Sequence, residues 1–140
     1  MTTDEIIALL GLAPHPEGGH YRQTWIAEAQ DGGRPAGTCI HFLLKGGERS
    51  HWHRVDAVEI WHFYAGAPLL LSTAASDAGP REDRVLGPDL AAGARPQLIV
   101  PERHWQAARS LGDWTLVGCT VSPAFRFEGF ELAPPDFDIS

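Results

Sequence analysis

The feature that most constrains the fold is a series of short apolar runs, separated by Gly, Pro and Asp, that recur along the chain. Several of these runs alternate apolar and polar positions and are rich in β-branched or aromatic residues, which is typical of strands. Many short strands at regular spacing indicate a β-sandwich or a closed barrel. The runs expected to form strands are residues 21–26, 38–44, 58–64, 69–73, 84–86, 97–100, 105–109, 114–121 and 127–132.

One short helix is expected at the N-terminus. Thr2 or Thr3 can cap it, and Gly11 and Pro14 would end it, because glycine and proline interrupt helices. Its apolar stripe consists of Ile6, Ile7, Leu9 and Leu10. The chain of 140 residues has no internal repeat, linker or low-complexity tract, so we expect residues 1–140 to form a single domain.

The charge of the chain argues against a nucleic-acid partner. Its formal net charge is -7 and its pI is about 5.4, whereas nucleic-acid-binding surfaces depend on clustered Lys and Arg. The N-terminal segment carries acidic residues where a signal peptide needs basic ones, and no apolar run reaches the ~18 residues of a membrane helix. We therefore expect a cytoplasmic protein that binds neither nucleic acid nor membrane.

The chemistry concentrates around His51 and His53, which flank Trp52. In an extended chain, residues two apart share a face, so both imidazoles are expected to point to one side. If a turn follows and a new strand begins near Val58, Glu59 returns to the same interior. Two imidazoles and one carboxylate suit a divalent transition metal such as Fe, Mn, Ni or Zn, with positions left open for a ligand.

This pattern resembles the first motif of the cupin superfamily. A glycine precedes His51 and His53, Glu59 follows, and Gly66 stands at the spacing that the motif requires after Glu59. The gap between His53 and Glu59 is one residue longer than usual, so Asp56 is an alternative to Glu59 as the acidic residue.

The second cupin motif should fall near Pro101. In this chain Gln106 stands at the usual histidine position, and His104 lies two residues earlier. The resemblance therefore implies that an amide completes the metal site, or that His104 replaces it. The implied metal ligands are His51, His53, Glu59 and Gln106.

Longer segments are similar to one group of the RmlC-like cupin superfamily, the cupin-5 family, long labelled a domain of unknown function. The resemblance covers nearly the whole chain and implies an all-β, cupin jelly-roll β-barrel. It also implies a homodimer and a pocket for a small-molecule ligand. The family resembles, in fold, sugar-nucleotide epimerases that work without a metal. The segments that carry the resemblance are residues 14–22, 50–56, 59–66, 105–109 and 114–125.

Residues 15–22 have two interpretations, a turn and a binding loop. Proline fixes φ and two adjacent glycines permit positive φ, which suits a turn. The same segment supplies Glu17, Tyr21 and Arg22, and an arginine can bind a carboxylate or phosphate through two hydrogen bonds. Further candidate ligand contacts are His41, Trp52, Arg54 and Trp105.

Three functions remain open. A metal-dependent enzyme would use its ion to polarise a carbonyl or to activate water or dioxygen, acting on a small polar metabolite. A metal-free isomerase or epimerase would use a histidine as base and Tyr21 or Tyr64 to return the proton, while Arg22 and Arg54 anchor an anionic substrate. A non-catalytic module would bind or sense a ligand in the same pocket. The candidate catalytic residues are His51, His53, Glu59 and Tyr64.

Overall fold

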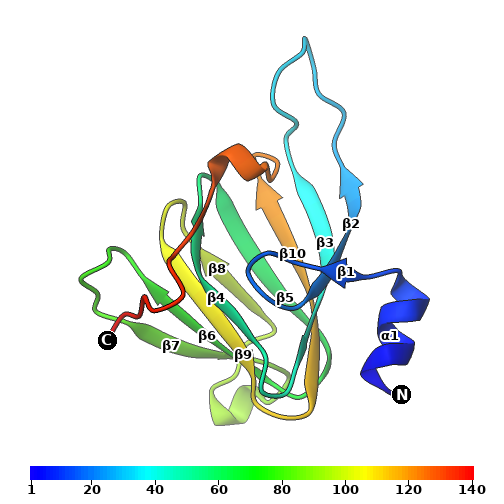
Figure 1. The fold of residues 1–140 in the computed structure, drawn as a ribbon, viewed down its shortest axis with the longest axis vertical. Helices are drawn as coiled ribbons and strands as arrows, with labels where there is room; N and C mark the ends of the chain where they lie inside the picture. The colour runs from blue at the N-terminus through cyan, green and yellow to red at the C-terminus, as the bar shows by residue number, and fades with distance from the viewer.

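The computed structural model describes residues 1–140. One α-helix is followed almost entirely by strands, with two short 3-10 helices between them (Figure 1). No helix is long and apolar enough to cross a membrane. The elements are α1 (Thr3–Leu10), β1 (Ala13–Pro14), β2 (His20–Ile26), β3 (Thr38–Lys45), β4 (Arg49–Val55), β5 (Val58–Gly66), β6 (Leu69–Ala74), β7 (Glu82–Leu86), η1 (Leu90–Ala92), β8 (Gln97–Val100), β9 (Trp105–Ser110), β10 (Trp114–Ser122), η2 (Phe127–Gly129) and β11 (Phe130–Leu132).

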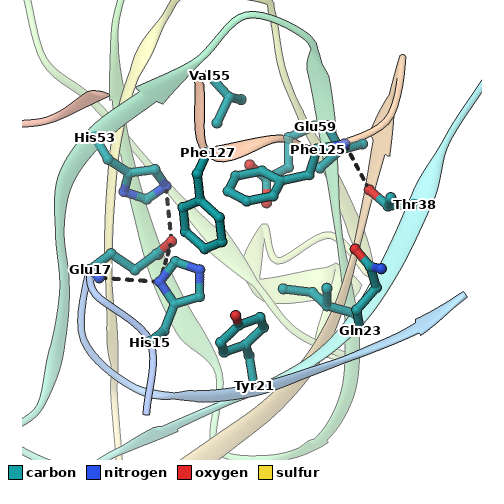
Figure 2. A pocket seen from close by; sticks show the side chains of 12 residues that line it. His15, Glu17, Tyr21, Gln23, Thr38, His53, Val55, Glu59, Phe125 and Phe127 are labelled. Carbon is teal, nitrogen blue, oxygen red and sulfur yellow. Dashed lines mark hydrogen bonds and ion pairs between the residues drawn. The ribbon is translucent and has the colours of Figure 1, made fainter. Parts of the chain in front are cut away.

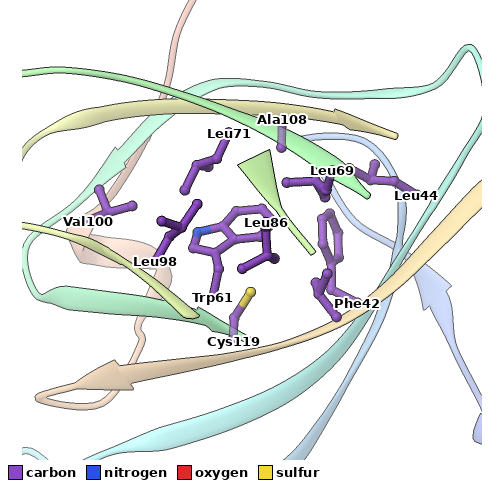
Figure 3. Close-up of a cluster of buried hydrophobic side chains, with 11 residues drawn as sticks. Phe42, Leu44, Trp61, Leu69, Leu71, Leu86, Leu98, Val100, Ala108 and Cys119 are labelled. Atoms are coloured by element: carbon purple, nitrogen blue, oxygen red, sulfur yellow. The ribbon is translucent and has the colours of Figure 1, made fainter. Parts of the chain in front are cut away.

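The strands form two antiparallel sheets whose inner faces pack together. One sheet has the order β1-β2-β3-β10-β5-β8 and the other has the order β11-β4-β9-β6-β7. The apolar core contains side chains from both sheets, among them Phe42 of β3, Trp61 of β5 and Leu71 of β6 (Figure 3). The predicted all-β architecture with a short N-terminal helix is confirmed, and its ladders form two sheets rather than one closed cylinder.

Helix α1 is capped at both ends by the residues that the sequence indicates. The Thr2 hydroxyl accepts a hydrogen bond from the Glu5 backbone N–H, and the Glu5 carboxylate accepts one from the Thr2 backbone N–H. Gly11 ends the helix in the left-handed conformation. The helix is held on β3 because Ile6 is buried against Leu43.

A bulge in β4 decides which of its histidines faces the interior. The register against β9 runs from Ser50 opposite Ala108 to His53 opposite Gln106, so β4 uses one residue more than β9 over this stretch. A bulge breaks the strict alternation of side chains between the two faces of a strand. The alternation that places His51 and His53 on one face therefore does not hold here.

The turn between β1 and β2 lies close to β3 and β4 because it contains two glycines. Gly18 and Gly19 have positive φ angles of 110° and 79°, and a Cβ atom on Gly19 would lie 2.8 Å from the ring of Phe42. The backbone N–H of His51 donates to the carbonyl oxygen of Glu17 at 2.8 Å, which fixes the turn to β4. The turn thus carries the side chains of its first residues to the space between the sheets.

Candidate functional site

A cavity of about 250 Å³ lies between the two sheets and is lined by five strands, the β1–β2 turn and the segment after β10. Figure 2 shows His15, Glu17 and His53 together on one side, Glu59 apart from them next to Phe125, and the rings of Phe125, Phe127 and Tyr21. The lining residues are His15, Glu17, Tyr21, Gln23, Thr38, Ile40, His53, Val55, Glu59, Val121, Phe125 and Phe127.

The Glu17 carboxyl group lies between two imidazole rings. Its Oε1 atom is 3.3 Å from Nδ1 of His15 and 3.5 Å from Nε2 of His53 (Figure 2). Its other oxygen, Oε2, accepts a hydrogen bond from the hydroxyl of Ser50. These contacts join the turn to β4, and all three titratable side chains have little exposure to water.

The hydrogen bonds that each ring makes with the backbone determine which nitrogen atoms carry hydrogen. The Nδ1 atom of His53 is 2.7 Å from the carbonyl oxygen of His51, and a carbonyl only accepts, so Nδ1 carries the hydrogen. The Nδ1 atom of His15 accepts from the backbone N–H of Glu17 at 3.1 Å. Neutral His53 therefore presents the lone pair of Nε2 to the Glu17 carboxyl group, whereas the Nδ1 lone pair of His15 is taken by the backbone N–H. A proton between Glu17 and His53 can belong to either group.

Burial places that proton on the carboxyl group. Loss of hydration raises the pKa of Glu17 to about 8, although the Ser50 hydrogen bond opposes the shift. Burial lowers the pKa of His15 to about 4, and it also lowers the pKa of His53. At neutral pH the group consists of a carboxylic acid and two neutral imidazoles.

A second carboxyl group, that of Glu59, is oriented by an amide. The indole Nε1 of Trp61 donates to Oε1 of Gln106 at 2.8 Å, so the amide nitrogen must face Glu59, to which it donates at 2.9 Å. Burial raises the pKa of Glu59 to about 7, and the nearby His53 opposes this shift. Near neutral pH, Glu59 is therefore protonated in part of the molecules and ionised in the rest.

Aromatic rings form the remaining wall of the cavity. Tyr21 packs edge-on against His15 with ring centres 4.4 Å apart, and Phe125 packs edge-on against Phe127 at 5.0 Å. Phe127 is half-exposed although it lines the cavity, so it lies at the boundary with solvent. The segment after β10 thus covers one side of the cavity with rings.

The structure brings together four of the predicted site residues, namely Glu17, Tyr21, His53 and Glu59. His51 does not line the cavity. Its Nε2 atom lies 2.8 Å from the carbonyl oxygen of Pro134, because the bulge turns the side chain toward the C-terminal segment. The expectation that His51 and His53 converge on one point is corrected accordingly.

Four predicted site residues lie outside the cavity. Two are the arginines that were expected to bind an anionic substrate, and the others are His41 and Tyr64. Arg22 lies against Gly11 at the end of α1, and Arg54 forms an ion pair with Glu131 at 2.9 Å. His41 and Tyr64 pack edge-on against each other with ring centres 6.0 Å apart, and neither lines the cavity. Strand alternation explains Arg22, since its two neighbours in β2, Tyr21 and Gln23, face the cavity.

The two tryptophans that were predicted to contact a ligand, Trp52 and Trp105, are instead buried and have structural roles. Trp52 is buried, and its indole N–H donates to Asp138 at 2.8 Å. Trp105 is buried in the same cluster and carries the Arg54 guanidinium over its ring at 4.4 Å. Asp56, the alternative acidic ligand, instead forms ion pairs with arginines of two loops.

The predicted metal ligands do not form a fitting donor set. His51 points away, and both ends of the Gln106 amide are engaged, its oxygen by Trp61 and its nitrogen by Glu59. His104, the alternative to Gln106, does not line the cavity. No group of three or more His, Cys, Asp and Glu side chains has an arrangement that could hold a metal ion.

Several cavity residues were not among the predicted site residues. His15 belongs to the segment that was considered a turn or binding loop. Gln23 was detectable, because it lies two positions after Tyr21 on the same strand and so shares its face. Nothing in the sequence pattern placed Phe125 and Phe127 at the cavity, since their segment is an irregular connection whose path depends on the fold.

The sequence from residue 4 to residue 133 matches the family described as Cupin_5, Cupin superfamily (DUF985). The chain belongs to this family. The resemblance to the cupin-5 family is therefore confirmed over nearly the whole chain. Comparison with curated proteins gives no match.

Two solved structures show how well the fold of this Cupin_5 chain is shared. A protein from Shewanella oneidensis is 42% identical with a TM-score of 0.89, covering 95% of this chain and 85% of that chain. A hypothetical protein from Leishmania major is 28% identical with a TM-score of 0.85, covering 95% of this chain and 88% of that chain. Because each likeness covers 95% of this chain, it includes most of the segments that build the cavity.

A more distant likeness links the chain to oxalate decarboxylase from Bacillus subtilis. The identity is 11% and the TM-score 0.65, with 85% of this chain covered. The chain spans 29% of the length of that enzyme. At this identity the likeness shows the cupin fold alone.

Proposed function

We propose that this protein is an enzyme that moves a proton at a carbon next to a carbonyl group, as an isomerase or epimerase of a small metabolite. The observation that carries the proposal is the position of the Glu17 carboxyl between the imidazoles of His15 and His53 at the cavity wall. Two kinds of titratable group with opposed pKa shifts in one cavity are typical of acid–base catalysis.

The carboxyl groups of Glu59 and Glu17 have different roles in the proposed reaction. Glu59, whose pKa is about 7, is ionised often enough at neutral pH to remove a proton from the substrate carbon. The proton on Glu17 passes to the carbonyl oxygen, so that an α-hydroxy carbonyl compound forms an enediol without build-up of charge. Glu59 then returns its proton to the neighbouring carbon while the hydroxyl on the first carbon gives its proton to Glu17, which yields the isomer and restores both groups. In an epimerisation, water would deliver the proton to the other face of the same carbon, Glu59 would lose its proton to solvent, and the enediol hydroxyl would return its proton to Glu17.

Supporting residues complete the site. The Gln106 amide holds Glu59, and the Ser50 hydroxyl holds Glu17, so both carboxyl groups keep a fixed direction. Phe125 and Phe127 limit the access of water to the reactive groups. A metal-dependent reaction receives less support, because the predicted donor set does not converge.

Hydrogen exchange tests this proposal. The protein is incubated in D₂O with a panel of small aldoses, ketoses and their amino derivatives, and deuterium at the carbon next to the carbonyl is measured by NMR. We expect incorporation that falls by about 100-fold or more in Glu59→Gln and in Glu17→Gln. The control is His62→Gln, because His62 contacts Thr120 and does not line the cavity.

Two other outcomes of the exchange experiment would speak against an enzymatic role. The proposal would be overturned if, for every compound in the panel, the wild-type protein exchanged hydrogen no faster than the Glu59→Gln variant does. If the same compounds raise the melting temperature without any exchange, the cavity serves binding alone.

A further inference from the structure

The charges of the cavity are unusual for a binding site. Its lining contains the carboxyl groups of Glu17 and Glu59 but no lysine and no arginine. Its two imidazoles supply no positive charge at neutral pH, since burial lowers the pKa of both His15 and His53. Every full charge that the lining can carry at neutral pH is therefore negative.

Three arginines that come from β4 and from the loops before β3 and after β10 are paired with carboxylates outside the cavity lining. Arg34 donates two hydrogen bonds to the carboxylate of Asp56, at 2.8 and 3.2 Å, and Arg126 donates a third at 3.2 Å. Arg54 is paired with Glu131. The lining therefore offers no positively charged side chain to pair with the phosphate or carboxylate group of a ligand.

The aromatic rings of the lining are suited to a positively charged ligand group. The faces of aromatic rings attract cations, and Tyr21, Phe125 and Phe127 all line the cavity beside the carboxyl groups (Figure 2). Aromatic rings combined with carboxylates form a common arrangement for ammonium groups. An uncharged sugar would use the rings only as an apolar surface.

We propose that the natural ligand of this cavity carries a protonated amine, as a small amino sugar or another amino carbonyl compound does. The ammonium group lies between the Glu59 carboxylate and the aromatic wall, and the carbonyl lies where the proton on Glu17 can reach it. The carbonyl part of this inference rests on the proposed function. The amine part rests on the lining alone.

The ionisation of the carboxyl groups follows from the same geometry. Glu17 contacts His15, His53 and Ser50, and none of these is a fixed cation. Glu59 contacts Gln106, which is also uncharged. A ligand cation beside Glu59 would therefore stabilise its carboxylate form, and because Glu59 is only partly ionised near neutral pH, binding should release protons to the solvent while Glu17 keeps its own.

Calorimetric titration tests the charge of the ligand. The probes are glucosamine, glucose and glucuronate, which share a ring and differ in charge, together with choline and its uncharged isostere 3,3-dimethylbutanol. We expect glucosamine and choline to bind about 10-fold tighter than their uncharged counterparts, and glucuronate to bind weakest. The enthalpy should depend on the ionisation enthalpy of the buffer, which reports proton release.

Variants separate this effect from the net charge of the protein. Glu59→Gln should reduce the preference for the ammonium probes, whereas Glu131→Gln, which removes an exposed carboxylate outside the cavity, should leave it unchanged. Equal affinity for charged and uncharged probes, tighter binding of glucuronate, or failure of both ammonium probes to bind at millimolar concentration would overturn the proposal.

The two proposals fail in different ways. Preferential binding of the ammonium probes without hydrogen exchange would contradict the enzymatic function and leave the ligand class intact. Exchange into uncharged sugars without any preference for an amine would contradict the ligand class and leave the function intact.

Discussion

Oε1 of Glu17 lies 3.5 Å from Nε2 of His53, and this contact joins the β1–β2 turn to the interior of β4. Two local irregularities make it possible. The glycines let the turn pass close to Phe42, and the bulge in β4 directs His53 into the cavity while His51 points outward. The reactive group therefore depends on departures from regular strand geometry.

Gly19→Ala should destabilise the fold and disrupt the turn. The residue has a φ of 79°, and its added Cβ would lie 2.8 Å from the Phe42 ring. Gly32→Ala is the matched control, because Gly32 also has positive φ but has no atom within 4 Å of the added Cβ. We expect a loss of about 1 kcal/mol for Gly32→Ala and about 3 kcal/mol for Gly19→Ala in urea unfolding. Equal losses would show that the close approach has no consequence.

The free energy of unfolding should fall as the pH rises from 6.5 to 8. In this range unfolded glutamates are ionised, whereas Glu17, with a pKa of about 8, keeps its proton in the folded state. The folded state then binds more protons, so stability decreases with pH, by about 2 kcal/mol. Below pH 6.5 the depressed pKa of His15 gives the opposite slope and offsets the effect.

Glu17→Gln is the variant that checks this pH dependence. Glutamine does not ionise, so most of the decrease between pH 6.5 and 8 should disappear when unfolding is measured across the range. Glu131→Gln, outside the cavity, should keep the wild-type slope. A wild-type stability that stays flat or rises over this range would contradict the assignment of the proton to Glu17.

Trp61→Phe should cost about 2 kcal/mol of stability. The change leaves a gap in the core and removes the donor that orients the Gln106 amide. Trp25→Phe is the comparison, because Trp25 is 56% exposed and should change stability by less than about 0.5 kcal/mol. Similar losses for the two variants, measured by chemical unfolding, would count against the role of the Trp61 hydrogen bond.

Asp56→Asn should loosen two loops at once. The carboxylate holds Arg34 through two hydrogen bonds and Arg126 through another, and these cations hold its pKa below the usual range. We expect a loss of about 1 kcal/mol, against less than about 0.5 kcal/mol for breaking the more exposed Arg54–Glu131 pair with Glu131→Gln. Thermal unfolding of both variants gives the comparison, and an equal effect would show that the Asp56 network adds nothing.

Regular elements were predictable because they follow from side-chain periodicity. The expected strands at 38–44, 97–100 and 114–121 match β3, β8 and β10 to within one residue at each end. The expected strand at 127–132 was only partly right, since its first three residues form η2. That segment contains Gly129, and a Cβ there would lie 2.2 Å from the Asp56 carboxylate, a contact between distant segments that periodicity does not report.

The candidate site was predictable only where alternation holds. Glu59 and Tyr21 face the cavity as regular strand residues, whereas His51 was placed on the wrong side because the bulge in β4 adds a residue. No local sequence signal marks that bulge. The role of Gln106 also depends on Trp61, which lies on the other sheet and fixes its amide.

The most direct test of the central claim is a histidine-selective ¹⁵N NMR titration with Glu17→Gln as reference. We expect His53 to be neutral at pH 7, with hydrogen on Nδ1 and a lone pair on Nε2, and to gain charge only well below its ordinary pKa because it is buried. This result is the one expected when Glu17, and not His53, holds the proton. A doubly protonated His53 at pH 7, or hydrogen on Nε2 alone, would contradict the account.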